Sequence, residues 1–225
     1  MRIAEIYRSI QGEGFLTGTE SVFVRTSGCN LRCWFCDTPY TSWEPEGEQR
    51  TAESLLDEVR SADCEHVVIT GGEPLLVPQL VPFTRAVAEL GRCITIETAG
   101  TVDVPVTAGL MSISPKLANS TPDHPVWRER HDRRRHRPEV IRRLTREYDY
   151  QLKFVIDKPE DVADVESYLA AFPHITPERV YLMPQARDRE PLREKNAWVE
   201  PLAASRGWRV SPRLHIELFG NTRGT

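Results

Sequence analysis

The chain has 225 residues, of which 40% are hydrophobic and 28% charged, with 17 prolines and a formal net charge of -4. This length predicts a single domain over residues 1–225 with a well-buried core. The acidic balance, and the lack of an apolar run long enough to span a bilayer, exclude a general affinity for nucleic acid or membrane.

Short runs rich in β-branched residues predict six buried strands. In chain order they cover residues 21–26, 66–70, 93–98, 110–114, 152–156 and 180–183. A last run, residues 213–218, alternates apolar and polar residues as an edge or terminal strand would.

Helical periodicity fills most of the intervals between these strands. The predicted helices cover residues 52–61, 78–90, 160–172 and 192–206. Thr51 is a suitable N-terminal cap for the first, and Gly207 a suitable C-terminal cap for the last. Alternating strands and helices imply a mainly parallel sheet, either open and doubly wound or an incomplete barrel. In both, ligands gather at the carboxyl ends of the strands.

The pattern breaks between residues 121 and 147, where arginine is frequent. Residues 131–137 read His-Asp-Arg-Arg-Arg-His-Arg. We expect an arginine-rich insertion or irregular segment here. It could bind a polyanion such as RNA, but in an acidic chain we favour a solvated helix or insertion whose arginines pair with nearby glutamates, Glu129, Glu139 and Glu147.

Three of the five cysteines, Cys29, Cys33 and Cys36, follow the first predicted strand closely. The chain begins without an apolar leader, so we expect a cytoplasmic protein, in which such a group indicates metal binding or catalysis before disulfides. Cys64 and Cys93 border apolar runs, and we predict that both are buried core residues.

The cysteine triplet suits a 4Fe-4S cluster better than a structural zinc ion. Zinc needs four protein ligands, and no second ligand pair follows. A cubane cluster takes one thiolate per iron, so three thiolates leave one iron open. Gly28 allows the chain to turn before the first cysteine, and we expect Trp34 and Phe35 to shield the cluster from water.

The spacing Cys29-x3-Cys33-x2-Cys36 resembles the signature of the radical S-adenosylmethionine (SAM) superfamily. A second segment, Thr70-Gly71-Gly72-Glu73-Pro74, resembles its Gly-Gly-Glu-Pro motif at the end of the second strand. The resemblance implies a partial TIM-like barrel of about six parallel strands, with a 4Fe-4S cluster on the cysteines and SAM on the open iron. The Gly72 backbone and the Glu73 carboxylate would then bind the methionine part of SAM.

Segments outside this shared core resemble the 7-carboxy-7-deazaguanine synthase family of the queuosine-precursor pathway. They are Ser-Ile-Gln-Gly-Glu-Gly at 9–14, Phe-Val-Arg at 23–25, Cys-Asp-Thr at 36–38, Glu-Thr-Ala-Gly at 97–100, Ser-Pro-Lys at 114–116, Tyr-Gln-Leu-Lys-Phe at 150–154 and Arg-Leu-His at 213–215. The resemblance is weakest over residues 121–147.

This resemblance implies a lyase that converts 6-carboxy-5,6,7,8-tetrahydropterin to 7-carboxy-7-deazaguanine with loss of ammonia. The reduced cluster would give SAM an electron, and the resulting 5′-deoxyadenosyl radical would remove hydrogen from the pterin before SAM is regenerated. Magnesium (Mg2+) would bind the substrate carboxylate. The resemblance does not tell which deazapurine the pathway ends in.

The family's functional residues carry over to matching positions of this chain. Thr38 is the expected magnesium ligand. Expected contacts to SAM are Phe35, Asp37, Gly72, Glu73, Gly100, Ser114, Pro115, Lys116 and Gln185. Expected contacts to the substrate are Ile10, Gln11, Gly12, Glu13, Arg25 and Thr98. Gln11 and Glu13 could otherwise be solvated turn residues, and Thr38 a loop residue.

Two other functions share part of this pattern. A glycyl-radical-enzyme activase has the same cysteine triplet but acts on a protein and needs no pterin site. A zinc-stabilised RNA-binding module would use the cysteines and the arginines, but no aromatic residues alternate with those arginines. Expected partners are the small-molecule substrate, a second copy in a homodimer, and an electron donor such as a flavodoxin or ferredoxin.

Overall fold

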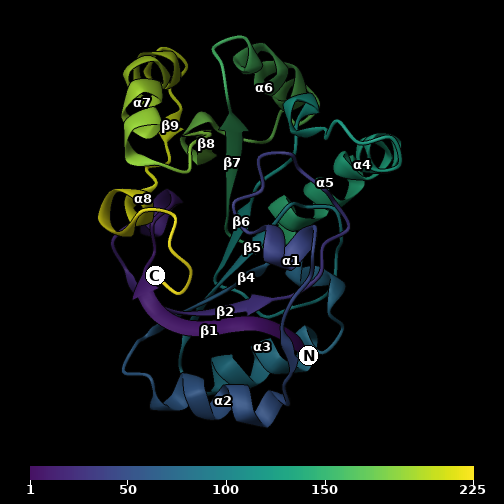
Figure 1. Cartoon of the computed structure of the whole chain (residues 1–225), viewed down its shortest axis with the longest axis vertical. Helices are drawn as coiled ribbons and strands as arrows, with labels where there is room; N and C mark the ends of the chain where they lie inside the picture. Colours follow the sequence, from purple (N-terminus) through teal and green to yellow (C-terminus); the bar gives the residue numbers. More distant parts are fainter.

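The computed structural model describes residues 1–225 and contains one nine-stranded sheet (Figure 1). The strands are β1 (Arg2–Ile10), β2 (Glu20–Thr26), β3 (Glu48–Gln49), β4 (His66–Gly71), β5 (Cys93–Thr98), β6 (Leu110–Ile113), β7 (Tyr150–Ile156), β8 (Val180–Pro184) and β9 (Arg209–Val210). Their order is β3-β1-β2-β4-β5-β6-β7-β8-β9. β1 is antiparallel to β2 and β3, and every pair from β2 onward is parallel. The expected partial barrel of about six parallel strands is confirmed.

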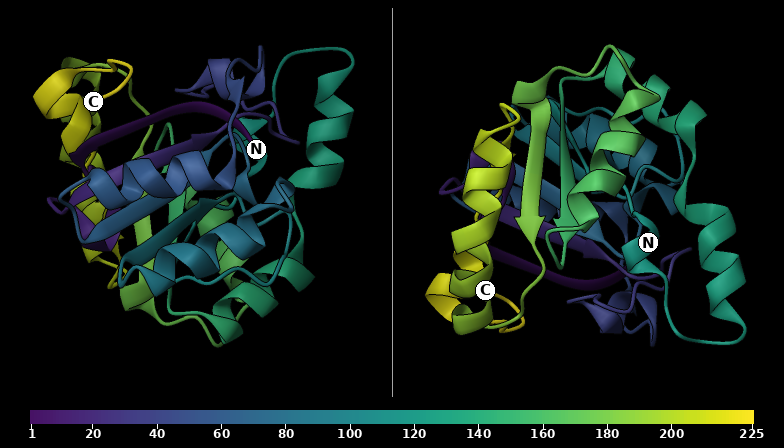
Figure 2. Two further views of the ribbon diagram at one scale, coloured as in Figure 1. Left: turned by 90° about the horizontal axis from the view of Figure 1, so that it is seen from below. Right: turned by 90° about the horizontal axis from the view of Figure 1, so that it is seen from above.

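Eight helices accompany the curved sheet, and most of them lie on its outside (Figures 1 and 2). They are α1 (Pro39–Ser42), α2 (Ala52–Ser61), α3 (Leu80–Glu89), α4 (Trp127–Arg135), α5 (Pro138–Glu147), α6 (Asp161–Ala170), α7 (Arg189–Ala204) and α8 (Leu214–Phe219). Four short 3-10 helices are η1 (Gly14–Leu16), η2 (Pro74–Leu76), η3 (Ala118–Ser120) and η4 (Pro177–Arg179). The predicted Thr51 cap is present, since its side chain accepts a hydrogen bond from the Ser54 N–H.

Side-chain alternation along the strands separates a core from a cavity. Along β7, Leu152, Phe154 and Ile156 lie in a core of 32 buried residues shared with the helices. Lys153 and Val155 point to the opposite face, where they line a cavity. β2, β4, β5 and β6 alternate in the same way, so the inner face of the sheet carries the polar residues.

The N-terminal strand β1 was not predicted from the sequence. It pairs with β2 along most of its length, with a register shift between Ile3 and Glu5. Its polar residues do not alternate cleanly with apolar ones, because Glu5 and Tyr7 line the cavity instead of facing solvent. A strand with a polar site on one face lacks the pattern of a half-buried strand.

The strand predicted at residues 213–218 is wrong, because this segment forms the helix α8. Pro212 has no N–H with which to continue the ladder of β9. Of the alternating apolar residues, only Ile216 is fully buried. Gly220, with φ 69°, then ends the helix in a left-handed conformation.

Residues 121–147 contain α4 and α5, so this segment is helical, as in the favoured interpretation, and is not irregular. α5 is an amphipathic helix that buries Val140, Ile141 and Leu144 in the core. This apolar stripe was not recognised in the sequence, because arginines lie between its members. α4 instead buries one residue, His131.

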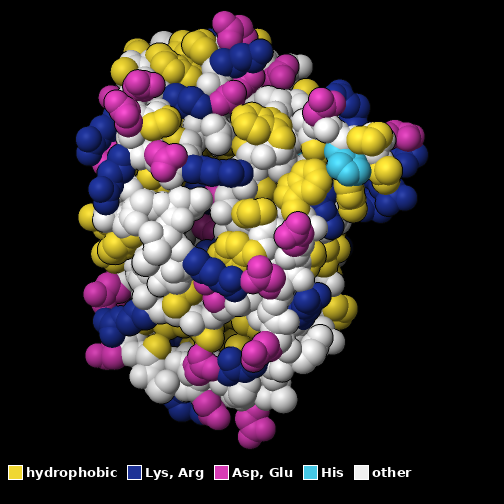
Figure 3. Space-filling model, viewed as in Figure 1, with side chains coloured by type: hydrophobic (Ala, Val, Ile, Leu, Met, Phe, Trp, Pro, Cys, Tyr) yellow, Lys and Arg dark blue, Asp and Glu magenta, His cyan; other side chains and the backbone are white.

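The expected pairing of the arginines with neighbouring glutamates is confirmed. The three ion pairs are Arg133 with Glu129 at 3.0 Å, Arg137 with Glu139 at 2.6 Å and Arg143 with Glu147 at 2.9 Å. Lys and Arg side chains are prominent over α4 at the edge of the molecule (Figure 3).

The two isolated cysteines differ in environment. Cys64 is buried at 5% exposure, as predicted. Cys93 is exposed, so the prediction for it is wrong; it is the first residue of β5, outside the buried part of that strand. No helix of the structure has both the length and the apolar character needed to cross a membrane.

Candidate active site

A cavity of about 280 Å³ lies on the inner face of the sheet, lined by residues from both ends of the chain. Figure 3 shows the molecule hollowed near the centre of this face. All but three of the predicted site residues line it: Ile10, Gln11, Gly12, Glu13, Arg25, Cys29, Cys33, Phe35, Cys36, Asp37, Thr38, Gly72, Thr98, Ser114, Lys116 and Gln185. The predictions for these residues therefore converge on one place.

The cysteine loop between β2 and α1 places all three of its thiols on the cavity wall. No three His, Cys, Asp or Glu side chains converge on a point that one metal ion could occupy. A cubane cluster takes one thiolate at each corner, so three cysteines on the cavity wall could hold three of its irons. Burial raises the pKa of Cys29 and of Cys33 to about 12, so cluster binding must displace their protons.

Of the two aromatic residues expected to shield the cysteines, only Phe35 does so. It is 8% exposed and packs with Leu31, Cys33 and Ala99. Trp34 is 47% exposed, and its Nε1 donates a hydrogen bond to the Asn119 carbonyl at 2.7 Å. Trp34 thus anchors the loop from outside.

The Gly71-Gly72-Glu73 segment packs directly against the cysteine loop. A Cβ at Gly72 would lie 2.2 Å from the Gly28 carbonyl oxygen, so only glycine fits there. The Glu73 N–H donates to the same carbonyl at 2.9 Å. The turn after β4 therefore fixes the entry to the cysteine loop.

The carboxylate of Glu73 is fully buried and does not line the cavity. It accepts hydrogen bonds from Thr98 Oγ1 at 2.8 Å, the Ala99 N–H at 2.8 Å and the Leu75 N–H at 3.1 Å. Burial raises the pKa of Glu73 above its usual value. Its contact with SAM remains a prediction.

Gly100 and Pro115 also lie outside the cavity lining. Gly100 has φ 68°, and a Cβ there would lie 2.4 Å from Ile141 Cδ1, so only glycine fits beside α5. Its contact with SAM stays a prediction. Pro115 is buried between Ser114 and Lys116. The Lys116 Nζ donates to Ser114 Oγ at 2.6 Å and to its carbonyl at 2.7 Å, which holds this turn together.

Thr38 and Gln185, which are far apart in the sequence, both line the cavity. Thr38 Oγ1 lies 3.8 Å from Cys36 Sγ and accepts from Thr41 Oγ1 at 3.3 Å. The Gln185 Oε1 accepts from Lys195 Nζ at 3.1 Å, just after β8 ends. The predicted magnesium ligand therefore lies beside the thiols.

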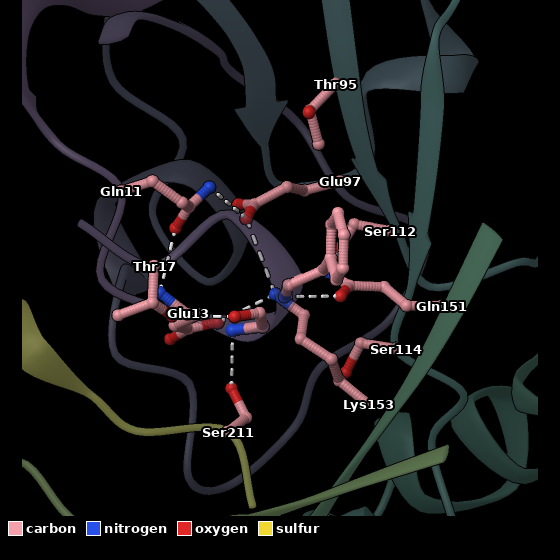
Figure 4. Close-up of polar contacts among 12 residues, drawn as sticks. Gln11, Glu13, Thr17, Thr95, Glu97, Ser112, Ser114, Gln151, Lys153 and Ser211 are labelled. Atoms are coloured by element: carbon pink, nitrogen blue, oxygen red, sulfur yellow. Dashed lines mark hydrogen bonds and ion pairs between the residues drawn. The ribbon is translucent and has the colours of Figure 1, made fainter. Parts of the chain in front are cut away.

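A buried ionic network forms another part of the cavity wall (Figure 4). Lys153 Nζ lies 2.8 Å from Glu13 Oε2 and 3.4 Å from Glu97 Oε1, and its side chain is 3% exposed. The Gln11 Nε2 donates to Glu97 Oε1 at 3.2 Å, and its Oε1 accepts from the Glu13 N–H at 3.0 Å. Gln11 is 5% exposed, so the alternative of solvated turn residues is wrong.

The C-terminal segment completes this network. Arg213 pairs with Asp37 and lies 3.3 Å from Glu13. Burial alone would raise the pKa of Glu13, but Lys153 and Arg213 hold it well below its usual value. A Cβ at Gly12 would lie 2.2 Å from the Nδ1 atom of His215, so the predicted glycine leaves room for this ring.

Arg25 is positioned by β1. Its Nε donates to Glu5 Oε1 at 2.6 Å and its Nη2 to the Tyr7 hydroxyl at 2.7 Å, which leaves Nη1 free. Glu5 also accepts from the Tyr40 hydroxyl at 2.8 Å. Arg223 lies 3.3 Å from Glu5 and 4.2 Å from the centre of the Tyr40 ring.

Several cavity residues were not assigned a role from the sequence. They are Glu5, Tyr7, Tyr40, Glu97, Lys153, Arg213, His215 and Arg223. One usable signal was Lys153, a charged residue in the middle of a strand that is otherwise apolar, where burial is costly without a partner. No comparable signal marks Arg223, whose position depends on tertiary structure.

Comparisons with known proteins show the family to which the chain belongs. The Radical SAM superfamily model matches residues 23–157. The chain is 47% identical to a 7-carboxy-7-deazaguanine synthase of Rhodopirellula baltica, over 99% of this chain and 88% of that protein. It is 43% identical to one of Halobacterium salinarum, over 99% and 92%.

Solved structures show the same fold. The crystal structure of QueE from Escherichia coli matches with a TM-score of 0.70 and 25% identity, covering 93% of this chain and 92% of that one. Streptococcus suis SuiB bound to S-adenosylmethionine matches with a TM-score of 0.54 and 17% identity, over 81% of this chain and 47% of that one. The SuiB match concerns the fold alone. The chain therefore belongs to the radical SAM superfamily and, within it, to the 7-carboxy-7-deazaguanine synthase family.

Proposed function

We propose that this chain forms 7-carboxy-7-deazaguanine from 6-carboxy-5,6,7,8-tetrahydropterin with loss of ammonia, as a radical SAM lyase of 7-deazapurine biosynthesis. The observation that carries this proposal is the shared cavity. The cysteine loop faces the same space as Arg25 and the Gln11-Glu13-Glu97-Lys153 network. A small anionic heterocycle would meet charged and amide groups there, next to the cluster.

Membership in this family brings a 4Fe-4S cluster, SAM and magnesium. When bound, the cluster and SAM supply the one-electron chemistry that starts the reaction. Cys29, Cys33 and Cys36 would hold the cluster. Phe35 would exclude water from it. Contacts to SAM would come from the residues around the cysteine loop and the strand ends: Asp37, Gly72, Glu73, Ser114, Lys116 and Gln185.

The substrate would be oriented by groups that the fold has already fixed. The free Nη1 of Arg25 would donate to the substrate carboxylate, while Glu5 and Tyr7 hold the guanidinium in place. Gln11 and Glu13 would bind the amino and ring nitrogen atoms of the pterin. A site held by buried partners needs little rearrangement when the substrate binds.

Thr38 would give magnesium one hard oxygen ligand, since its hydroxyl lines the cavity. Magnesium usually keeps several waters and takes one or two protein ligands together with an anionic group of the substrate. The ion would therefore join Thr38 to the carboxylate that Arg25 binds.

The relatives favour this function over the two alternatives. A glycyl-radical-enzyme activase would need an opening for a protein segment, whereas this cavity carries a charged network suited to a small molecule. A zinc-stabilised RNA-binding module would not need that buried charged network, because RNA would bind at the arginine-rich surface. The arginines of α4 and α5 are in part neutralised by acidic neighbours, so we propose no nucleic-acid partner.

The decisive experiment is anaerobic reconstitution followed by assay. Holoprotein supplied with SAM, reductant, magnesium and carboxytetrahydropterin should form the deazaguanine, with SAM not consumed. Deoxyadenosine formed without that product would keep the superfamily chemistry and reject the substrate. Protein that binds one zinc and no sulfide would reject the whole proposal.

Replacing Arg25 with glutamine is expected to raise KM for the carboxylated pterin about tenfold to 150-fold. This range follows from the loss of a charge-assisted hydrogen bond of about 1.5–3 kcal/mol. A pterin analogue that lacks the carboxylate should bind the variant and the wild type equally. Arg8→Gln is the matched control, because Arg8 is half-exposed and pairs with Glu20. An unchanged KM in Arg25→Gln would rule out the proposed carboxylate contact.

We also propose that two copies associate in the cytoplasm and receive electrons from a flavodoxin or ferredoxin, without a membrane partner. Five free thiols suit a reducing compartment. Large apolar side chains are exposed at Phe15, Leu218 and Phe219, as at many subunit interfaces. Sedimentation of the holoprotein at micromolar concentration should give a dimer, and a monomer would count against association.

A further inference from the structure

Two backbone N–H groups on either side of Cys33, those of Arg32 and Trp34, are held from outside the cysteine loop. The Arg32 N–H donates to Nδ1 of His131 at 3.1 Å, and the Trp34 N–H donates to the Ser120 carbonyl at 3.3 Å. His131 belongs to α4, and Ser120 ends the short helix η3. The middle ligand of the expected cluster therefore lies between two external anchors.

The His131 ring is fully buried, and its hydrogen bonds set its tautomer. Ser120 Oγ donates to the Leu117 carbonyl at 2.6 Å, so Nε2 of His131 must donate to Ser120 Oγ, 2.9 Å away. Nδ1 is then left as the acceptor for the Arg32 N–H. Burial lowers the pKa of His131 to about 4, which keeps the ring neutral near pH 7.

Apart from His131, no residue of α4 is buried. Figure 1 shows this helix standing apart at the edge of the molecule. Its Trp127 ring lies 4.1 Å from the Arg32 guanidinium, whose Nη1 donates to the Cys29 and Leu31 carbonyls at 2.7 Å each. Arg134 Nη1 donates to the Asn30 carbonyl at 3.3 Å. Each of these contacts is directed at the cysteine loop.

We propose that α4 is a brace for the iron-binding loop and that His131 is its positioning residue, acting on Cys33 through the Arg32 peptide. The hydrogen bond to Nδ1 fixes the orientation of that peptide and keeps its N–H from turning toward a cluster sulfur. Hydrogen bonds to sulfur alter the stability and reduction potential of iron-sulfur clusters, so the brace would tune the cluster as well as hold it.

Two substitutions separate the hydrogen bonds of His131. His131→Asn places an amide oxygen near the position of Nδ1, where it can still accept from Arg32, but loses the bond to Ser120. His131→Gln places an amide nitrogen near the position of Nε2, keeps the bond to Ser120, and leaves the Arg32 N–H unpaired. Each variant loses one buried hydrogen bond, so the two are matched in their general cost to the fold.

The readout is the cluster, not turnover. Reconstituted His131→Gln should release iron to a chelator about tenfold faster than wild type, in the range seen when groups behind metal ligands are removed. Its reduced cluster should also give an altered electron paramagnetic resonance spectrum. His131→Asn should behave as the wild type in both measurements. The unfolding temperature of the metal-free protein should fall equally in the two variants.

Equal iron release by both variants, or no change in either, would overturn the brace and leave His131 a structural residue. If both variants fail to fold, Trp127→Ala tests the same brace from the surface and should also speed iron release. This inference rests on cluster binding by the proposed function. Wild-type protein without a cluster would overturn both, whereas a stable cluster in all variants would overturn the brace alone.

Discussion

Replacing Lys153 with methionine is expected to lower the free energy of unfolding by about 3–5 kcal/mol, the cost of leaving a buried charge without its partner. The Lys153 ammonium lies between Glu13 and Glu97 and is 3% exposed. Methionine fills a similar volume but offers no charge. Glu13 keeps Arg213, whereas Glu97 loses its one ion pair. Turnover should fall at least a hundredfold, since Gln11 and Glu13 lose their alignment.

The effect of Lys153→Met should grow with pH. In the wild type the pKa of Glu13 is lower in the folded state than in the unfolded state. Its contribution to the free energy of unfolding is therefore fully present above the unfolded-state pKa, and it is lost as pH falls from there through the folded-state pKa. Without Lys153, Arg213 still opposes the effect of burial, so the pKa of Glu13 rises toward its usual value. The wild type therefore gains stability as pH rises through the acid range toward neutrality, and the variant gains less.

Denaturant unfolding of the two proteins across this pH range measures the difference. Lys158→Met is the control, because Lys158 is exposed in the loop after the same strand. It should stay within about 0.5 kcal/mol of wild type at every pH. A gap between Lys153→Met and wild type that is constant with pH would contradict the account of the network.

Gly72→Ala is expected to remove the ability to retain the cluster and to destabilise the chain by about 1–3 kcal/mol, as overpacking does. The new Cβ would lie 2.2 Å from the Gly28 carbonyl oxygen and 2.7 Å from that of Thr41. Both are backbone atoms, so no side-chain rotation relieves the clash. The peptide before Cys29 must move, and the first ligand of the cluster moves with it.

Gly109→Ala provides a matched control for this prediction. Neither glycine has φ in the left-handed region, but at Gly109 the nearest atom to a new Cβ is the Ile94 carbonyl oxygen at 3.6 Å. That variant should be neutral, or more stable by about 0.4–1 kcal/mol through the unfolded state. Iron and sulfide per chain after reconstitution is the measurement. Normal iron content in Gly72→Ala would show that the loop tolerates the shift.

The sequence predicted the parallel strands well because each is a short run rich in β-branched residues. Cys93 to Thr98 was predicted to the residue. The errors fall where tertiary contacts replace local pattern. Residues 213–218 alternate like a strand. In the structure Arg213 is instead buried beside Asp37 and Glu13, and the residues that follow form the helix α8.

The candidate site was predictable where chemistry needs a fixed spacing in the chain, as with the cysteines. It was not predictable where a side chain acts through distant partners. The need for glycine at position 100 has a second reason that the sequence does not show, because a Cβ there would meet Ile141, 41 positions further along the chain. The sequence showed that Glu73 offers a carboxylate to a ligand. It could not show that this carboxylate accepts three hydrogen bonds, from Thr98, Ala99 and Leu75.

The contacts that close the cavity join the two ends of the chain. Arg223 meets Glu5 across 218 positions, and the Gly14 N–H donates to Ser211 Oγ across 197. Contacts between residues so far apart in sequence form slowly, because a long loop must close before they can stabilise anything. The sheet can therefore assemble strand by strand while the cavity is still open. A nascent chain whose residues 211–223 have not yet emerged from the ribosome would have the cysteine loop but no finished pocket, so we expect the cluster to be secured only after these residues have emerged.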